Sequence, residues 1–358
     1  MRVVLLGGAG YLGAVATRHL SALGHHVSVV DGLIYQRDDD PQHLLPTAGS
    51  FVHADLRDPQ ALRRAVDGAD AVVHMGGLVG EPACALDERL AVELNFASPV
   101  LAAAAARDLG VPHYVLFSSC SVYGQREGTV DEDTAPHPLG IYARTKVLAE
   151  QHVRDVLDGH ADVTVLRLAT VHGRSPRQRL DSVVNRMTAQ AVATGRIPLN
   201  GGSQRRPLVH VTDVAEVLAA VLNRPNGHSG GHRVLNVGTD RENYTIAQIA
   251  QTVARAVPGT QIDQGPEQDE ADARDYHTSF GRLASLFPGA CPTPLIDGVR
   301  QISGAMADHQ IIDPDLPEYD NLKGLRACHA AGRLHAVRSA ECDRLQEQYD
   351  RAYGGVAR

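Results

Sequence analysis

The sequence lacks tryptophan, and aromatic residues make up only 4 % of its 358 residues. Hydrophobic residues still reach 43 %, so the core must consist mainly of valine, leucine and alanine, as in parallel sheets covered by helices. The formal net charge is −8, which favours neither a nucleic acid nor an anionic membrane as a partner. No apolar run reaches about 18 residues, and the first strand-like run starts at residue 2. We therefore expect no membrane span, no signal peptide and a cytoplasmic location.

Cysteine is scarce. The chain has five cysteines without a paired short spacing, namely Cys84, Cys120, Cys291, Cys328 and Cys342. An odd, scattered set is typical of free thiols in a reducing compartment. Two of them lie near His329 and His335, but this spacing matches no zinc-ligand pattern. We expect helix-face residues there and no metal.

A glycine-rich turn follows the first strand-like run at residues 3–6. Glycines stand at positions 7, 10 and 13, and an amphipathic helical pattern covers residues 11–23. In such a turn Gly7 permits the tight bend, Gly10 lets the backbone approach a pyrophosphate, and Gly13 lets the helix pack on the strand. The free N–H groups of the helix N-terminus attract the anion. A purely structural turn is the alternative, but the flanking strand and helix favour a dinucleotide site.

Asp31 ends the second strand-like run, eighteen residues after Gly13. A carboxylate at this place accepts hydrogen bonds from an adenosine ribose diol and repels a 2′-phosphate. The cofactor predicted from the sequence is therefore NAD rather than NADP. An ordinary solvated turn aspartate before Gly32 is the alternative.

Strand-like and helical runs alternate along the chain, which predicts an α/β fold with a doubly wound Rossmann parallel sheet. The strand-like runs of the first part are residues 3–7, 27–31, 50–53, 70–74, 113–118 and 163–168. The helical runs are residues 11–23, 59–67, 86–108 and 142–158, followed by 178–194, 212–223, 245–256 and 297–307. Short strands at 207–211 and 233–237 indicate a smaller C-terminal α/β substrate lobe that returns strands to the main sheet. We expect an NAD-binding domain at 1–172, an interleaved substrate lobe at 173–312 and a helical C-terminal tail at 313–358.

Tyr142 and Lys146 stand one helical turn apart on the same helix face. Ahead of them, Ser118, Ser119 and Ser121 follow a strand, at the sheet edge where ligands of open α/β folds bind. Lowering a tyrosine pKa of about 10 to near neutrality costs about 4 kcal/mol. A nearby ammonium and a cationic nicotinamide ring can supply that free energy, while a serine hydroxyl holds the substrate oxygen.

With these motifs the chain resembles the extended short-chain dehydrogenase/reductase family, in its NAD-dependent epimerase/dehydratase branch. The resemblance runs from residue 1 to about 308 and includes Asp55-Leu56, residues 74–77, 167–173, 206–213 and 272–279. It implies that Tyr142 is the catalytic base, that Lys146 is its partner, and that Ser119 is the third catalytic residue, with Ser118 and Ser121 next best. The cofactor contacts that follow are Gly7, Gly10, Tyr11, Leu12, Gly13, Asp31, Asp55, Leu56, Met75, Gly76, Gly77, Ser118, Tyr142, Lys146 and Ala169. The expected substrate contacts are Ser119, Cys120, Ser121, Tyr142, Thr170, Arg206 and Arg274.

Departures from the family pattern narrow the expected activity. Sugar-nucleotide dehydratases of this family carry an Asp–Glu pair directly after the catalytic Ser or Thr, whereas this chain has Cys120 and Ser121. Neither residue can act as a carboxylate base, so dehydration is disfavoured. Thr170 and His172 replace a usual asparagine and tyrosine, and Gly76-Gly77 replaces a usual Ala-Ala. These changes affect the sugar contacts rather than the redox chemistry.

The resemblance and its departures lead to one main hypothesis. We expect an NAD-dependent epimerase that oxidises a nucleotide-diphosphate sugar, at C4, to a keto intermediate and reduces it on the other face. The alternatives are a dehydrogenase or ketoreductase of the same fold and a non-catalytic NAD-sensing protein. Arg206 and Arg274 are expected to anchor the substrate diphosphate, with surface salt bridges as the alternative. Glu81 and Asn95 are expected to be structural.

The oligomeric state is predicted from the long helical runs 86–108 and 142–158. The first is rich in alanine at residues 102–106, and the resemblance implies that this helix pair forms a four-helix dimer interface. We expect a homodimer, with burial of the same face inside one chain as the alternative.

Overall fold

The strands of the N-terminal half assemble into one parallel sheet. The computed structural model describes residues 1–35, 50–224, 231–265, 275–311, 313–334 and 339–354. Its central sheet has seven strands in the order β11-β7-β5-β4-β1-β2-β3. Their bounds are β1 Arg2–Leu6, β2 His26–Asp31, β3 Ser50–His53, β4 Ala71–His74, β5 His113–Ser119, β7 Asp162–Leu168 and β11 His232–Val237. The strand order reverses between β1 and β4, which is where open α/β sheets bind ligands. The predicted doubly wound α/β fold is confirmed.

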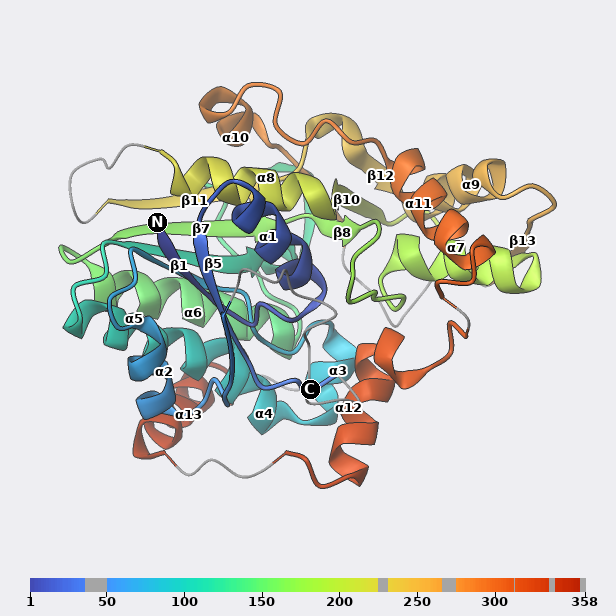
Figure 1. The fold of residues 1–358 in the computed structure, drawn as a ribbon. Helices are drawn as coiled ribbons and strands as arrows, with labels where there is room; N and C mark the ends of the chain where they lie inside the picture. The colour runs from blue at the N-terminus through green and yellow to red at the C-terminus, as the bar shows by residue number, and fades with distance from the viewer. Residues whose placement is uncertain (36–49, 225–230, 266–274, 312, 335–338, 355–358) are drawn as a thin grey trace.

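Helices cover both faces of this sheet (Figure 1). One face carries α1 (Tyr11–Ala22), α8 (Val211–Leu222) and α10 (Gly281–Leu286), and the other carries α2 (Pro59–Val66), α5 (Ser98–Asp108) and α6 (Ile141–Leu157). Successive side chains of a strand point to opposite faces. Along β1, Val3 and Leu5 therefore pack with α1 and α8, whereas Val4 and Leu6 pack with α2, α5 and α6. All four are almost fully buried, as the valine- and leucine-rich runs predict.

A smaller α/β unit adjoins the C-terminal edge of the main sheet. Its strands are β8 (Thr170–His172), β10 (Arg205–His210) and β12 (Asn243–Thr245) in one sheet and β9 (Arg196–Leu199) with β13 (Gln261–Gln264) in another. Its helices are α7 (Val183–Thr194), α9 (Ile246–Ala256) and α11 (Leu295–Ala307), packed around Val184, Leu208 and Ile249. A further parallel pair joins β6 (Gln125–Val130) to β14 (Asp275–Thr278). As expected, the lobe returns a strand, β11, to the main sheet; the domain boundaries at 172 and 312 stay predictions.

The helix predicted at 86–108 begins two residues later, at Glu88, and contains an irregular turn. The chain forms α3 (Glu81–Leu86), α4 (Glu88–Val92), a π-helical turn (Glu93–Ala97) and then α5. Asp87 has a non-helical backbone, and its carboxylate accepts a hydrogen bond from Leu90 N at 2.9 Å, which caps the start of α4. Pro99 lacks the N–H that would bond to the carbonyl of residue 95, and a wider π turn accommodates the break.

The helix predicted at 178–194 begins later, at Val183. Tertiary hydrogen bonds hold the preceding residues out of the helix. Gln178 Oε1 accepts from Ser175 N at 3.1 Å, and Arg179 O accepts from Asn185 Nδ2 at 2.8 Å. A helix over residues 178–194 would need the Arg179 carbonyl as acceptor for the N–H of residue 183, and here it accepts from the Asn185 side chain instead.

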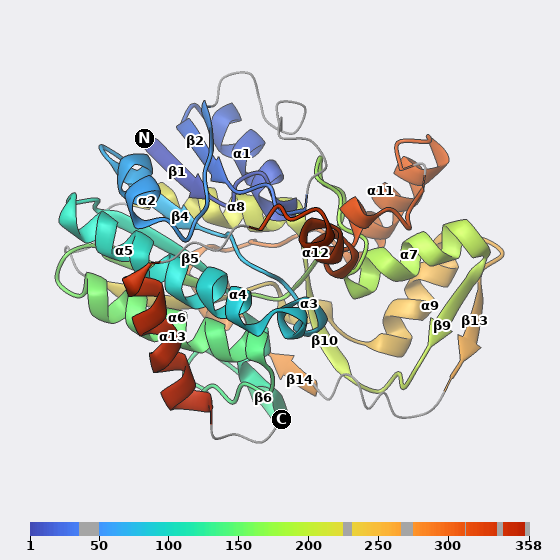
Figure 2. The same cartoon turned by 90° about the horizontal axis from the view of Figure 1, so that it is seen from below.

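The C-terminal tail consists of two separate helices rather than one. α12 (Asn321–Ala330) contacts α3, and α13 (Ala340–Tyr353) packs on α4, α6 and the π-helical turn (Figure 2). Leu325 is buried on α12, and Leu345 and Tyr349 are buried on α13. Each of the two tail helices therefore has buried residues that join the packing and exposed residues that face solvent.

Candidate active site

The glycine-rich turn closes tightly between β1 and α1. Gly7 has φ +87°, and a Cβ atom there would lie 2.3 Å from Gly76 Cα. A Cβ atom on Gly13 would lie 2.5 Å from the carbonyl carbon of Gly8. Only glycine fits either place, so the turn brings the N-terminus of α1 directly to the sheet edge. This cradle fits a dinucleotide pyrophosphate.

The Asp31 carboxylate is fixed beside this turn. Its Oδ2 accepts from Ala9 N at 3.0 Å, and its Oδ1 accepts from Leu33 N at 2.9 Å. Burial raises the pKa of Asp31, although both backbone N–H groups counteract that rise. The carboxylate thus lies between the glycine turn and the loop after β2, rather than in a free solvated turn, and lines the cavity described next.

A cavity of about 970 Å³ opens at the C-terminal edge of the main sheet, between the sheet and the smaller lobe. Most of the residues predicted to bind cofactor or substrate line it. They are Gly7, Gly10, Tyr11, Leu12, Gly13, Asp31, Asp55, Leu56, Met75, Gly76, Gly77, Ser118, Ser119, Tyr142, Lys146, Ala169, Thr170 and Arg206. Residues as far apart in the chain as Gly7 and Arg206 therefore meet at one site.

Ser119, Tyr142 and Lys146 meet at the wall of this cavity. Tyr142 and Lys146 come from α6, and the Lys146 Nζ lies 5.9 Å from the centroid of the Tyr142 ring. The same Nζ donates to the carbonyl of Phe117 at 3.1 Å, which holds the ammonium at the end of β5. The Ser119 hydroxyl hydrogen-bonds to Tyr142 and lowers its pKa. This is the spatial arrangement that proton transfer at a carbinol requires.

Burial changes the pKa values of both ionisable members. It raises the pKa of Tyr142 above its ordinary value, while Arg179 and the hydrogen bond from Ser119 act in the opposite direction. Burial lowers the pKa of Lys146 to about 8. Lys146 therefore still carries its positive charge at neutral pH, next to the phenol that it must help to ionise.

Ser118 has a different partner. Its hydroxyl donates to Glu150 on α6, and Glu150 forms a 2.7 Å ion pair with Arg167 on β7. Arg167 Nη1 donates to the Tyr123 hydroxyl at 3.0 Å. This buried network ties β5, α6 and β7 together. It leaves Ser119 as the serine whose hydroxyl faces Tyr142.

Cys120 and Ser121 lie in a short 3₁₀ turn behind the cavity and do not line it. Cys120 is fully buried, and its Sγ donates to the Arg167 carbonyl at 3.3 Å. Ser121 is 2 % exposed and its Oγ has no hydrogen-bond partner among the described residues. The structure does not bring either side chain to the substrate contacts expected of it, because the 3₁₀ turn points both into the core.

The predicted anion contacts of the lobe have different surroundings. Arg206 lines the cavity and is 4 % exposed, with Nη1 donating to the Arg205 carbonyl at 2.7 Å. Its neighbour Arg205 forms a 3.0 Å ion pair with Asp275 outside the cavity lining. Thr170 lines the cavity at the start of β8. Arg274 lies outside the described residues.

With this geometry in place, comparison with known families is decisive. The model of the NAD dependent epimerase/dehydratase family matches residues 3–238. The chain belongs to this family. It is therefore an NAD-dependent enzyme of the sugar-nucleotide epimerase or oxidoreductase type, and the expected cofactor and family are confirmed.

Several relatives share most of this chain. UDP-glucose 4-epimerase from Azospirillum brasilense is 26 % identical over 289 residues, covering 74 % of this chain and 81 % of that protein. The enzyme of the same name from Bacillus subtilis (strain 168) is 28 % identical over 298 residues, covering 73 % and 84 %. The structure of MoeE5 in complex with UDP-glucose and NAD matches with a TM-score of 0.74 at 25 % identity, covering 87 % of this chain and 100 % of MoeE5. Part of this chain therefore has no counterpart in the solved MoeE5 chain.

Glu81 and Asn95, both expected to be structural, lie at or beside this family member's cavity. Glu81 lines it and caps α6, because its Oε2 accepts from Tyr142 N at 3.2 Å and its Oε1 from Ala143 N at 3.5 Å. Asn95 is structural, as expected, and its Nδ2 donates to the Leu78 carbonyl at 2.9 Å. Sequence reasoning missed other residues that line the cavity, namely Tyr35, Arg177 and Arg179, together with Asp320, Asn321 and Leu322 of the tail. No local sequence signal marks these residues, because their contacts join segments far apart in the chain.

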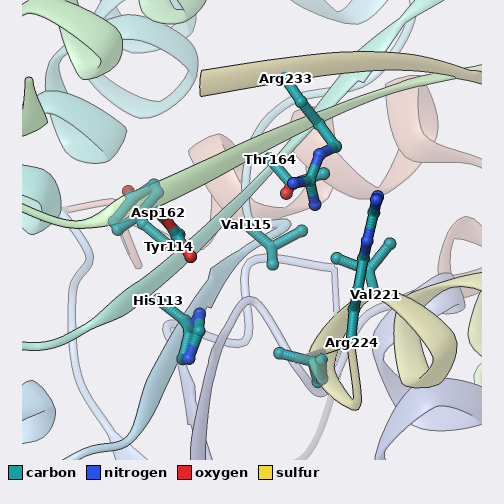
Figure 3. Close-up of a pocket in the computed structure, with 9 residues that line it drawn as sticks. His113, Tyr114, Val115, Asp162, Thr164, Val221, Arg224 and Arg233 are labelled. Atoms are coloured by element: carbon teal, nitrogen blue, oxygen red, sulfur yellow. The ribbon is translucent and has the colours of Figure 1, made fainter. Parts of the chain in front are cut away.

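A second, much smaller pocket lies at the opposite edge of the sheet (Figure 3). It has a volume of about 20 Å³, and His113, Asp162, Arg224 and Arg233 are among its lining residues. No predicted site residue lines it, and a volume of this size holds about one water molecule. The large cavity therefore remains the candidate active site of this family member.

The described residues also bear on metal ions and on membranes. Among the described residues, no group of three or more His, Cys, Asp or Glu side chains could hold a metal ion. Cys328 and Cys342 are buried on different helices of the tail, and His335 lies outside the described residues. Within the same part of the chain, no helix is both long and apolar enough to cross a membrane.

Proposed function

We propose that the protein is an NAD-dependent epimerase that inverts C4 of a nucleotide-diphosphate sugar through a transient keto intermediate. The observation that carries the proposal is the meeting of Ser119, Tyr142 and Lys146 at the wall of the cavity that the glycine turn opens into. Membership of the epimerase/dehydratase family and the names of the relatives agree with it.

The residues of the chain divide the proton chemistry between them. Ser119 holds the substrate hydroxyl, and the ionised Tyr142 removes its proton as the carbinol is oxidised. The Lys146 ammonium favours the ionised form of Tyr142. NAD, which the glycine turn and Asp31 would hold, would supply a hydride acceptor that is regenerated in each cycle, so no cofactor would be consumed. After the keto sugar has turned over in the cavity, Tyr142 gives the proton back to its carbonyl oxygen, and the new hydroxyl has the opposite configuration.

The residues at 120 and 121 support epimerisation over dehydration. Elimination of water from a keto sugar needs an acid and a base beside the ring. Cys120 and Ser121 carry no carboxyl group, and both side chains lie behind the cavity wall. The nearby carboxylate of Glu81 already accepts hydrogen bonds from the N-terminus of α6.

The substrate class follows from the anion contacts and from the relatives. Arg206 is a buried guanidinium at the cavity wall, which suits a substrate diphosphate. Thr170 also lines the cavity, at a position where the family resemblance has an asparagine. Solved relatives hold UDP-glucose or UDP-glucuronic acid together with NAD. We therefore infer a UDP-sugar of this kind as the first substrate to test.

The test is product analysis on NAD-loaded protein in deuterated water. The protein is incubated with UDP-glucose and, separately, with UDP-glucuronic acid, and products are identified by proton NMR. We expect the C4 epimer, no deuterium at carbon and no absorbance of NADH at 340 nm. Stoichiometric NADH without an epimer would instead identify a dehydrogenase, and deuterium at C5 or C6 with loss of water would identify a dehydratase. Binding without any turnover would favour the sensor hypothesis.

A further inference from the structure

The C-terminal tail forms part of the cavity wall. Figure 2 shows α12 beside α3, between the main body and the helices of the smaller lobe. The Tyr319 carbonyl accepts from Leu180 N at 2.7 Å, and Asn321 N donates to Asp181 Oδ2 at 3.3 Å. On the other side, His329 Nε2 lies 3.3 Å from a carboxylate oxygen of Asp87. The tail thus bridges the two sides of the cavity mouth.

Arg177 is a buried cation in this wall. It is 7 % exposed and lines the cavity, with its guanidinium 5.1 Å from the centroid of the Tyr35 ring. Its Nη1 and Nη2 reach Asn321 Oδ1 of α12 only at 3.4 and 3.5 Å. Arg179, two residues on, is ion-paired with Asp181. Arg177 has no ion pair with a carboxylate in the part of the chain that the structure describes.

Hydrogen bonds connect the segment before Arg177 to the first turn of α1, next to the glycine turn. Two residues earlier, the Ser175 hydroxyl donates to the Tyr11 carbonyl at 2.7 Å. The Tyr11 hydroxyl in turn donates to the Gly173 carbonyl at 2.7 Å. These bonds fasten the segment before Arg177 to the first turn of α1, where the backbone N–H groups attract anions.

We propose that Arg177, held between Tyr35 and Asn321 of the C-terminal tail, binds a diphosphate group in the cavity, so that the tail takes part in ligand binding. A buried guanidinium whose contacts are long and neutral retains donors for an anion, and its planar fork matches two phosphate oxygens. Burial lowers the pKa of Arg177, because the charged guanidinium loses its contact with water. A bound anion offsets this loss of solvation. The diphosphate belongs either to NAD or to the nucleotide sugar, and only the second source rests on the proposed function.

The experiment uses two full-length variants and a matched control. Arg177→Met removes the guanidinium. Asn321→Asp keeps every other group but gives Arg177 a carboxylate partner that competes with the ligand. Arg326→Met makes the same change as the first variant at an exposed position of α12. Isothermal titration measures NAD affinity of the apoprotein and UDP affinity of the NAD-loaded protein, and thermal unfolding is followed in parallel.

We expect Arg177→Met to weaken binding of NAD, of UDP or of both by about 10- to 100-fold. Asn321→Asp should weaken the same ligand by about 10-fold without lowering the thermal midpoint, because the new ion pair strengthens tail docking. A loss confined to NAD places the cofactor diphosphate at Arg177, and a loss confined to UDP places the substrate diphosphate there. Arg326→Met should bind both as the wild type does.

Unchanged affinities would overturn the proposal. If Arg177 only supports the fold, Asn321→Asp leaves both affinities at wild-type values while the thermal midpoint holds or rises. If Arg177→Met fails to fold, Asn321→Asp alone decides, since it removes no buried group. The readout is binding and not turnover, so an absence of epimerase activity would count against the proposed function and leave this result unaffected.

Discussion

At the scale of single residues, Tyr142 and Lys146 illustrate how burial works against the chemistry of this site. Burial favours the uncharged form of both side chains, which raises the pKa of Tyr142 and lowers that of Lys146 to about 8. The Ser119 hydrogen bond and Arg179 lower the pKa of Tyr142. The site thus keeps the phenol protonated until further positive charge enters the cavity, which fits a base that acts only in the loaded enzyme.

Replacing Tyr142 by phenylalanine tests its role as base. Tyr142→Phe keeps the ring but removes the proton acceptor, so we expect kcat to fall by about 1,000-fold or more. NAD affinity should stay close to the wild-type value, because the glycine turn and Asp31 are untouched. Tyr244→Phe is the matched control, since its hydroxyl bonds to Glu242 outside the cavity lining. Turnover that survives in Tyr142→Phe would show that the base is another group.

The lowered pKa of Lys146 makes stability depend on pH in a defined window. The folded-state value of about 8 lies below the ordinary value of 10.5, so the unfolded chain binds more protons between these two pH values. The free energy of unfolding should therefore gain from Lys146 as pH rises from 8 toward 10.5. Lys146→Met removes this gain. Urea unfolding of both proteins at pH 7.5 and 9.5 measures it, and a difference that does not change with pH would contradict the assignment.

The serines after β5 show how much of the candidate active site can be predicted from residue spacing alone. The run of serines after β5 predicts a catalytic hydroxyl, and the structure supports Ser119 as its source. The sequence cannot show that Ser118 donates to Glu150, thirty-two residues away, or that the 3₁₀ turn points Cys120 and Ser121 into the core. Those orientations depend on tertiary contacts of β5 with α6 and β7, which no local pattern encodes.

At the scale of elements, the regular βα units are predictable and their interruptions are not. Strand β4 and helix α6 lie within one or two residues of their predicted ranges, because continuous apolar runs and helical periodicity are local signals. Pro99 is visible in the sequence, yet whether it ends, kinks or widens a helix depends on packing. Here a π-helical turn forms, and it places Asn95 where its amide bonds to the Leu78 carbonyl behind Gly77.

Glu81 links α3 to the N-terminus of the catalytic helix α6. Its carboxylate accepts from the N–H groups of Tyr142 and Ala143 and also raises the pKa of Tyr142. Glu81→Gln should lower the free energy of unfolding by about 1 kcal/mol, because the helix N-terminus loses its anion. Removing the negative charge lowers the pKa of Tyr142, so activity should persist to lower pH than in the wild type.

Two measurements check this variant. Urea unfolding reports the stability change, with Glu216→Gln at an exposed position of α8 as control. The pH dependence of kcat reports the second effect, since a lower pKa of the base moves the acidic limb of the profile to lower pH. A limb that stays in place or moves to higher pH would show that Glu81 does not influence Tyr142 electrostatically.

At the scale of the whole molecule, the tail changes which surfaces are available. α13 packs on α4, α6 and the π-helical turn, and Arg89 forms a 2.8 Å ion pair with Asp343 across this contact. On α5, Ala102, Ala103 and Ala106 are already fully buried within the chain. The sequence predicts a helical tail, but neither its division into α12 and α13 nor the place where each helix docks. The homodimer expected from the long helices stays a prediction, and α13 lies over part of the face it would use.

Replacing Leu345 tests how much the docking of α13 contributes to the stability of the fold. Its side chain is 8 % exposed and belongs to the core cluster that α2, α5 and α6 share. Leu345→Ala should lower the free energy of unfolding by about 2 to 4 kcal/mol, because a buried leucine leaves a cavity. Gln348→Ala, exposed on the same helix, should change it by less than about 0.5 kcal/mol.

Amide hydrogen exchange shows whether the same variants lose protection of their amides locally or throughout the fold. Loss of protection confined to α12 and α13 means that the tail opens as a unit while the main sheet stays folded.

Sedimentation velocity of wild type and Leu345→Ala tests whether the protein forms a dimer. Since a dimer through α4 and α6 must also touch α13, loosening this helix should weaken the dimer. A wild type that sediments as a monomer at all concentrations would rule out the homodimer, and equal dimer fractions in both proteins would place the interface away from α13.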